Sequence, residues 1–327
     1  MSPQETPGTI GVLLPRDIPR ADLIPFAQEA DDYGFDELWV VEDLGYRGGL
    51  VQAATVLART RRIRVGVGLL PAAARNVAFA AMEVATLAQL HPGRLDIAVG
   101  HGMPDWMRSV GAWPASPLTL LGEYIRTLKA LLAGRPADTD GRYIRLDGDG
   151  VRLDPSVLPE LPEHVPDIFA GVRGPKSLAL SGEVADGTLL AEPVSPEYVR
   201  QALTSINPRR PHRLAAYNIT VVDDDPHAAL AAARPALQPL GDPDWAPHIV
   251  PLGFHDELAA LRRTSRSAQE FAQTIPEEWA HRLALTGTPD QVRTRLQDLF
   301  ESGVTTTVLS PVGPDYRSAL AGLAKLL

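Results

Sequence analysis

The chain has 327 residues, of which 45% are hydrophobic, and α/β barrels of this length regularly form one domain. It contains no cysteine, which excludes a disulfide framework, a thiolate metal site and a cysteine nucleophile. Its formal net charge of −9 argues against a nucleic-acid partner, because binding to a phosphate backbone requires a basic surface.

From residue 9 to residue 134, apolar runs typical of buried strands alternate with segments whose apolar residues recur at helical spacing. Strands are predicted at residues 9–15, 36–41, 62–71 and 94–100, and helices at 21–34, 48–60, 76–90 and 118–134. Near-continuous apolar strands separated by helices are typical of a parallel sheet that is covered on both faces.

The alternation resumes after an irregular stretch near residues 135–166, which we interpret as an insertion. Three more strands, each followed by a helix, are predicted at 166–170, 187–191 and 213–222. A mixed segment near 241–281 is interpreted as a second insertion, and a helix at 288–303, a strand at 304–310 and a helix at 315–327 close the chain.

Eight strand and helix units in one chain of this length favour a closed (β/α)8 TIM barrel with insertions, with residues 1–327 as a single domain. The alternative is a doubly wound open sheet, which is disfavoured because no GxGxxG pattern follows the first strand. The amino-terminal segment is polar, and no stretch approaches the roughly 20 apolar residues that span a bilayer. We therefore expect a cytoplasmic protein with neither a membrane nor a nucleic-acid partner.

In a barrel, the residues just past each strand face the active site, so the candidates can be read from the strand ends. They are Glu42, Asp43 and Tyr46 after the second strand, His101 and Trp106 after the fourth, and Glu192 after the sixth. Glu42 and Asp43 could instead cap the next helix, and Tyr46 and Trp106 could merely close the barrel mouth. His101 lies between two glycines that offer no side chains for packing, which favours a functional role.

The segment AGVRGPKSLALSGEVADG, beginning at Ala170, predicts a strand, a glycine turn and a helix start. Free backbone N–H groups at a helix start hold anions, and Arg173 and Lys176 add positive charge, so we predict a phosphate site here rather than only a tight turn. No metal site is expected, because His101 has no second histidine at ligand spacing.

Three segments, residues 62–102, 170–192 and 287–311, resemble signature stretches of the bacterial luciferase-like monooxygenase superfamily. VVEDLGYRGG and the RGPK turn are most similar to the branch that uses the deazaflavin coenzyme F420, of which methylenetetrahydromethanopterin reductase is typical. The resemblance implies a barrel that binds F420, or alternatively FMN, at its carboxyl-terminal mouth. It places the phosphate on Gly171, Val172, Arg173, Gly174, Pro175 and Lys176, a non-prolyl cis peptide at Gly68 and Leu69, Asn76 in the cofactor site, and His101 near the ring.

We interpret the chain as an F420-dependent oxidoreductase that transfers a hydride between the deazaflavin and a small organic substrate, with Glu42, Asp43 or His101 handling the proton. Several members of the branch have an acid–histidine pair after strand two, where this chain has Glu42 and Asp43. Tyr46, Trp106 and Glu192 are predicted to contact the substrate. The resemblance also implies a homodimer.

Two alternatives stay open. One is an FMN-dependent monooxygenase that takes reduced flavin from a separate flavin reductase and activates oxygen. The other is a flavin-binding protein without turnover, or a barrel enzyme acting on a sugar phosphate, although a binding protein would not need protonatable groups at strands two and four. Arg16, Arg47 and Arg75 follow strands one to three and could guide the longer anionic tail of F420, or could instead pair with Glu42, Asp43 or Asp105.

Overall fold

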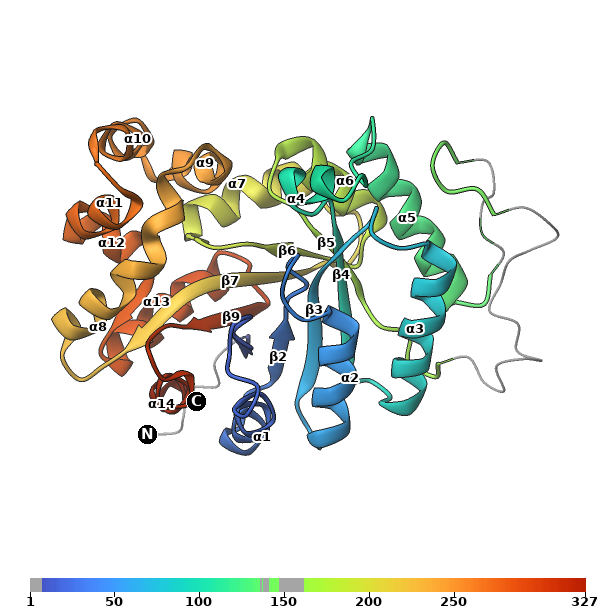
Figure 1. Ribbon diagram of the computed structural model, residues 1–327, viewed down its shortest axis with the longest axis horizontal. Helices are drawn as coiled ribbons and strands as arrows, with labels where there is room; N and C mark the ends of the chain where they lie inside the picture. Colours follow the sequence, from blue (N-terminus) through green and yellow to red (C-terminus); the bar gives the residue numbers. More distant parts are fainter. Residues whose placement is uncertain (1–7, 136, 138–140, 147–161) are drawn as a thin grey trace. The chain divides into compact units, whose positions relative to one another are not determined.

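The computed structural model describes residues 8–135, 137, 141–146 and 162–327, so much of the predicted insertion near 135–166 lies outside the described residues. Figure 1 labels the helices and strands along the chain. By their contacts the residues divide into two compact units. Unit 1 consists of Met1–Glu37, Leu190–Ser205 and Leu214–Leu327, and unit 2 of Leu38–Leu189 and Ile206–Arg213. The prediction of a single domain over residues 1–327 stays a prediction.

The described residues form nine strands in one sheet. The strands are β1 (Thr9–Leu13), β2 (Glu37–Val40), β3 (Arg64–Pro71), β4 (Leu95–Gly100), β5 (Ile168–Gly171), β6 (Gly187–Leu190), β7 (Arg213–Val222), β8 (Leu285–Gly287) and β9 (Thr306–Pro311). Their order is β6-β5-β4-β3-β2-β1-β9-β7-β8, and an additional pairing of β6 with β7 closes the ring. The predicted (β/α)8 barrel is confirmed, with β8 as one extra strand beside β7.

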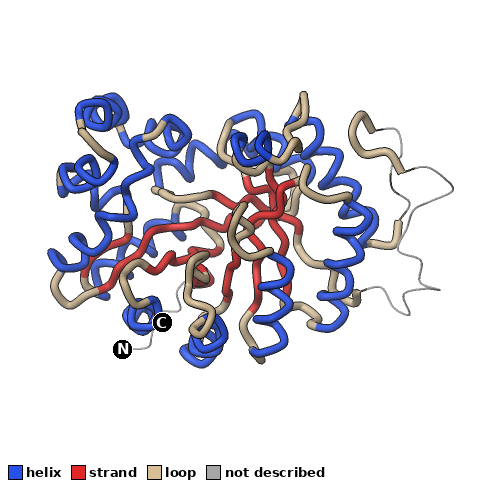
Figure 2. The backbone as a smooth tube through the Cα atoms, in the orientation of Figure 1, coloured by secondary structure: helices blue, strands red, loops and turns tan. Residues whose placement is uncertain are grey.

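Helices follow most strands (Figure 2). The helices are α1 (Leu23–Tyr33), α2 (Gly49–Arg59), α3 (Val77–Leu90), α4 (Pro104–Ser109), α5 (Pro117–Leu132), α6 (Pro175–Val184), α7 (Pro196–Ile206), α8 (Pro226–Ala233), η1 (Arg234–Gly241), η2 (Pro243–Trp245), α9 (Ala246–Ile249), η3 (Val250–Leu252), α10 (His255–Thr264), α11 (Ala268–Thr274), α12 (Glu277–Leu283), α13 (Pro289–Glu301), α14 (Tyr316–Leu323) and η4 (Ala324–Leu326). No helix of the described residues is both long and apolar enough to cross a membrane.

The interior of unit 2 is filled by large side chains that lie over glycines of neighbouring strands. A Cβ on Gly66 would overlap the Trp39 ring, and a Cβ on Gly187 would lie 2.5 Å from the Phe169 ring. The two rings meet edge to face, with centroids 5.7 Å apart. Both side chains are fully buried, so glycine at these two strand positions is what makes room for the aromatic core.

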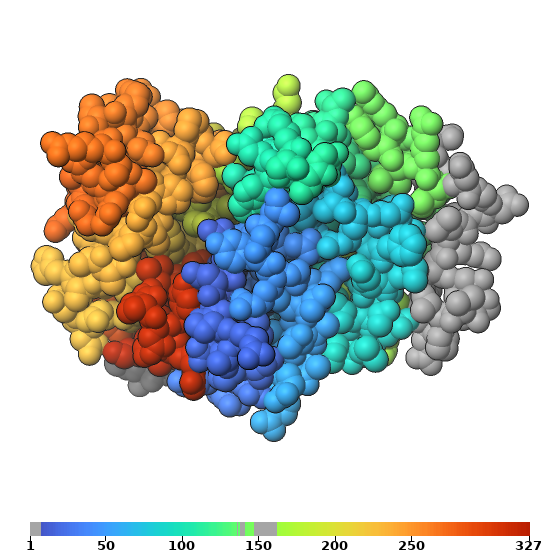
Figure 3. Space-filling model, viewed as in Figure 1, coloured from blue at the N-terminus to red at the C-terminus, as the bar shows by residue number. Residues whose placement is uncertain are grey.

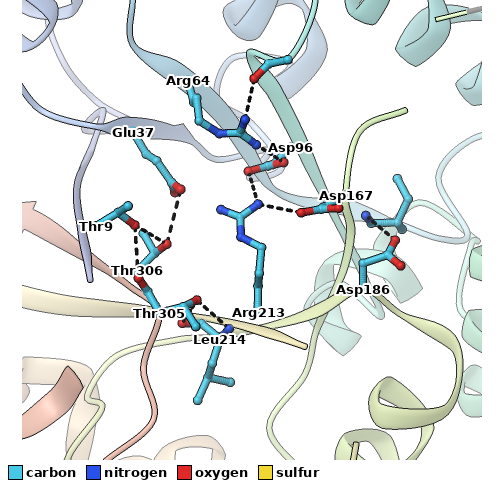
Figure 4. A network of polar contacts seen from close by, with 12 residues as sticks. Thr9, Glu37, Arg64, Asp96, Asp167, Asp186, Arg213, Leu214, Thr305 and Thr306 are labelled. Carbon is cyan, nitrogen blue, oxygen red and sulfur yellow. Dashed lines mark hydrogen bonds and ion pairs between the residues drawn. The ribbon is translucent and has the colours of Figure 1, made fainter. Parts of the chain in front are cut away.

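A charged layer closes the opposite end of unit 2 from the strand carboxyl ends (Figure 4). Asp96, near the start of β4, is 1% exposed and lies 2.8 Å from both Arg64 and Arg213. Arg213 also contacts Asp167 at 2.9 Å, and its guanidinium lies 4.9 Å from the centre of the Phe169 ring. This end is therefore held by ion pairs, which leaves the strand carboxyl ends as the place for a ligand.

In unit 1 the segment predicted as an insertion near 241–281 is largely helical and supports a core of its own. Ile219 of β7 belongs to a buried apolar cluster with Leu230 of α8 and Phe271 of α11. Phe254 also belongs to this cluster, and its ring stacks in parallel on that of Trp279, with centroids 4.9 Å apart. The insertion is thus a packed part of unit 1.

Candidate functional site

The carboxyl ends of β3, β4 and β5 lie side by side in unit 2. Their register pairs Pro71 with Gly100, and Gly100 with Gly171. The loops that carry His101 and the predicted anion turn therefore begin on adjacent strands, as a barrel requires.

β3 contains a bulge directly before its end. The register between β3 and β4 shifts between Val67 and Leu70, so that Gly68 and Leu69 occupy the bulge. The peptide bond between Gly68 and Leu69 is cis, as the family resemblance implies. A second cis bond joins Glu192 to Pro193 in unit 1, and no sequence pattern predicted it.

Glu42 is held in place by three hydrogen bonds. Its two carboxylate oxygens accept from the Arg75 guanidinium at 2.9 and 3.1 Å, and Oε2 also accepts from the Gly49 N–H at 2.8 Å. Arg75 lies 3.9 Å from Glu83 as well, and its pKa is raised because these carboxylates outweigh the effect of burial, the largest single influence. The sequence suggested that Arg75 either guides the tail of F420 or pairs with an acidic residue, and the structure shows it paired with Glu42.

His101 is half-buried after β4, and its surroundings favour the neutral ring. Burial lowers the pKa of His101, and a hydrogen bond to the Pro117 backbone only partly offsets this. Nε2 lies 3.1 Å from the Ser177 hydroxyl. A neutral imidazole that donates to Pro117 through its other nitrogen leaves Nε2 to accept from Ser177.

The predicted anion turn has the form that the sequence indicates. α6 begins at Pro175, its N-cap residue is Gly174, and no side chain caps its first N–H groups. A Cβ on Gly174 would have no heavy atom within 4 Å, so a ligand can approach the backbone here. Lys176 is exposed in the first turn, and Arg173 is half-buried just before it.

The other predicted residues lie in several environments. Tyr46 is 49% exposed, and its N–H donates to the Asp43 carbonyl oxygen. Trp106 is half-buried in α4. Asn76 caps α3, because its side-chain oxygen accepts from the Ala78 N–H. Their cofactor and substrate contacts stay predictions.

Glu192 belongs to unit 1, as does Arg16, whereas the residues predicted to handle the proton or hold the phosphate belong to unit 2. Sequence reasoning missed Ser177, the partner of His101, although it directly follows the RGPK turn, and Gly49, whose N–H is bound by Glu42. Among the described residues, no three His, Cys, Asp or Glu side chains converge to hold a metal ion. The polar groups gathered here can instead hold an anion and move a proton.

Comparison with known proteins places this geometry in a family. The family model of the luciferase-like monooxygenases matches residues 4–306. The chain is 28% identical over 331 residues to a 5,10-methylenetetrahydromethanopterin reductase of Methanolobus tindarius, covering 97% of this chain and 98% of that protein. It is 26% identical to an F420-dependent glucose-6-phosphate dehydrogenase of Nocardia farcinica, covering 91% and 90%.

Among solved structures, the chain is similar to the coenzyme F420-dependent tetrahydromethanopterin reductase of Methanopyrus kandleri, with a TM-score of 0.83. The two share 20% sequence identity over 98% of each chain, so this likeness supports the barrel fold. With the family model matching most of its length, the chain belongs to the luciferase-like monooxygenase family.

Proposed function

We propose that the protein is an F420-dependent oxidoreductase that transfers a hydride between the deazaflavin and a small organic substrate. The observation that carries this proposal is the start of α6, which no side chain caps and which has Arg173 and Lys176 beside it. This helix start follows β5, and β5 pairs with β4, the strand that precedes His101. The relative from Nocardia farcinica, which matches 91% of this chain, is named as an F420-dependent dehydrogenase, and this supports the same function.

The turn at Gly171–Lys176 fits an anionic cofactor by the chemistry of its donors. The N–H groups of Lys176 and Ser177 are free of side-chain caps at the positive end of α6, and Gly174 leaves the approach open. Arg173 and Lys176 would hold the phosphate, together with the backbone N–H groups of Lys176 and Ser177. When bound there, F420 supplies a ring that accepts or donates a hydride.

Among the three candidates for proton handling, His101 is favoured. Its ring is neutral near pH 7 because burial lowers its pKa, so Nε2 can take a proton and later return it. Ser177 orients the ring through its hydroxyl. Glu42 has both carboxylate oxygens engaged by Arg75, so we assign it a positioning role, and Asp43 is the alternative proton donor.

A homodimer is part of the proposal, and α2 and α3 of unit 2 offer the surface for it. Val51 of α2 is 72% exposed, and on α3 Phe79 is 66% and Leu90 68% exposed. In Figure 3 the side chains of these two helices lie at the surface, in blue and cyan. Large apolar side chains exposed on adjacent helices are typical of a contact between protein chains. We propose that a second copy of this chain binds to this surface of α2 and α3. We also propose that the protein is cytoplasmic.

The proposal is tested by offering F420 and FMN separately to the purified protein and measuring binding by the change in cofactor fluorescence. We expect F420 to bind more tightly than FMN. If FMN binds as tightly or more tightly, and reduced FMN supports oxygen consumption with a flavin reductase, the monooxygenase function replaces this one. If cofactor binds but a screen of alcohols, aldehydes and pterins gives no reduction or oxidation of it, the non-catalytic alternative is favoured.

A further inference from the structure

An apolar groove of about 290 Å³ lies among three helices of unit 1, which Figure 1 labels α10, α11 and α12. The groove is lined by a single face of α10, because the residues that α10 contributes recur three and four positions apart, at Glu257, Ala260, Leu261 and Thr264. Other walls come from Thr274, the last residue of α11, and from Trp279 of α12. Helical spacing therefore determines which side chains face the groove.

Among the described residues that line this groove, Glu257 carries the only charge. The Thr264 hydroxyl donates to the Ala260 carbonyl oxygen at 3.1 Å, within its own helix. The Thr274 hydroxyl likewise donates to the Glu270 carbonyl oxygen at 2.9 Å. The Glu257 side chain is exposed, and its carboxylate has no hydrogen bond or ion pair to any described residue. A ligand with an apolar body and a positive charge therefore suits the lining, whereas an anion would be repelled.

The Trp279 ring is held rigidly at one wall of the groove. It stacks on the Phe254 ring, with centroids 4.9 Å apart and 5° between the ring planes. The Arg282 guanidinium lies 5.3 Å from the centre of the Phe254 ring and is paired with Glu197 at 3.0 Å, so its charge is balanced. Trp279 is half-buried, and the part of the indole that Phe254 leaves uncovered faces the groove. Indole rings attract cations more strongly than other aromatic side chains.

We propose that this groove binds a small organic cation, an alkylated ammonium ion whose charge is attracted by the Trp279 ring and the Glu257 carboxylate. The apolar walls accept the alkyl groups, and the indole and the carboxylate provide the negative potential. An inorganic cation would gain nothing from the apolar walls and would lose part of its hydration shell. The site does not depend on the proposed function, because none of its residues belongs to the cofactor site.

Choline is the probe for this site, and dimethylbutanol, in which a carbon atom replaces the choline nitrogen, is its uncharged counterpart. Heteronuclear NMR of the full chain follows the indole N–H signal of Trp279, which is assigned by its loss in Trp279→Phe. We expect choline to shift this signal with a dissociation constant in the millimolar range. Dimethylbutanol should bind about fivefold more weakly, because it has the same shape but no charge for the ring and the carboxylate to attract.

Two matched variants separate the role of Glu257 in binding from its role in the helix. Glu257 lies in the first turn of α10, where a negative charge also stabilises the helix. Glu278 occupies the first turn of α12 in the same way but does not line the groove. Calorimetry should show that Glu257→Gln weakens choline binding about threefold and leaves dimethylbutanol binding unchanged, whereas Glu278→Gln changes neither. Trp279→Leu, which removes the ring, should weaken choline binding about fivefold.

Circular dichroism and melting curves establish that each variant is folded before binding is measured. If Trp279→Leu fails to fold, the comparison of Glu257→Gln with Glu278→Gln decides, because both carboxylates are exposed. A Trp279 signal that does not move at about 50 mM choline, far above a millimolar dissociation constant, overturns the inference. Equal affinities for choline and dimethylbutanol, or equal losses in the two glutamine variants, also overturn it. These measurements need no cofactor, so their outcome is separate from that of the proposed function.

Discussion

Arg75 binds Glu42 through both arms of its guanidinium, at 2.9 and 3.1 Å, across the loops that follow β3 and β2. The pair is partly shielded, with 27% of the Arg75 side chain and 15% of the Glu42 side chain exposed. A bidentate pair fixes orientation as well as distance. The loop after β2, which carries Asp43 and Tyr46, is therefore tied to the start of α3.

Breaking this pair should destabilise the fold and loosen the loop. Arg75→Ala leaves the half-buried Glu42 with only the Gly49 N–H, so we expect a decrease of about 1–3 kcal/mol in the free energy of unfolding. Arg75→Lys should recover only part of it, because an ammonium cannot form the two parallel bonds. Urea denaturation of Arg75→Ala, of Glu42→Gln and of the double variant Arg75→Ala/Glu42→Gln gives the coupling energy between the two side chains, and Arg75→Lys is measured in the same way. A coupling near zero would contradict the structural role of the pair.

The anion turn makes a second prediction, for cofactor affinity. Replacing both Arg173 and Lys176 by alanine should weaken F420 binding by about 1.5–3 kcal/mol for each charge-assisted hydrogen bond that is removed, while the melting temperature stays close to that of the wild type. Wild-type affinity should also fall as salt rises, since exposed charges are screened within about 8 Å at physiological ionic strength. Arg126→Ala, which removes an exposed charge from α5, is the control. If calorimetry shows that the double variant binds both cofactors with unchanged affinity, the prediction that this turn binds the phosphate is contradicted.

The charged layer predicts a large effect on stability with little effect on binding. Asp96→Asn leaves Arg64 and Arg213 without their buried partner, and breaking a buried ion pair costs about 3–5 kcal/mol. Asp167→Asn is the matched control, because Asp167 bonds the same arginine but is 42% exposed, so its removal should cost about 1 kcal/mol or less. Equal decreases of unfolding free energy in the two variants would show that burial does not decide the strength of these pairs.

His101 predicts a pH dependence with a definite sign. Because burial lowers its pKa in the folded state, the unfolded chain binds a proton more readily below the ordinary imidazole value of 6.5. The contribution of the neutral His101 ring to the free energy of unfolding is therefore complete above pH 6.5, and it is lost as the pH falls through the lower folded-state pKa. His101→Asn should reduce this decrease in melting curves between pH 8 and pH 5. His212→Asn, at another histidine whose pKa burial lowers, should do the same without changing the pH dependence of cofactor binding.

The exposed apolar side chains of α2 and α3 predict the oligomeric state. The double variant Phe79→Glu/Leu90→Glu places charge on the proposed contact between two copies, so light scattering should show a monomer where the wild type is a dimer. Val250→Glu, at an exposed apolar residue of unit 1, should leave the oligomeric state unchanged. A wild-type protein that is already a monomer would refute the dimer.

The strands were predictable because a parallel barrel buries both faces of its sheet, which leaves nearly continuous apolar runs in the sequence. β8 escaped prediction because a strand of only three residues, Leu285–Gly287, carries no readable periodicity. α4 was likewise missed, since it is six residues long. Short elements depend on tertiary contacts that a local pattern does not encode.

The candidate site, like the fold, could be predicted only in part from the sequence. Sequence position located His101, Glu42 and the turn before α6, because strand ends converge in a barrel. It did not reveal that Glu42 is committed to Arg75, or that Ser177 faces His101, since both pairings join residues 33 and 76 positions apart along the chain. Partners of that kind are set by strand register, which one sequence does not display.

The aromatic side chains that fill unit 2 determine from which end of the strands a ligand can approach. Trp39 and Phe169 occupy the space that Gly66 and Gly187 provide, and the ion pairs of Asp96 close the layer beyond them. Within the described part of this unit, buried aromatic rings and ion pairs fill the interior below the strand carboxyl ends. A ligand of this unit would therefore approach from the strand carboxyl ends, and two ligands would share that one approach.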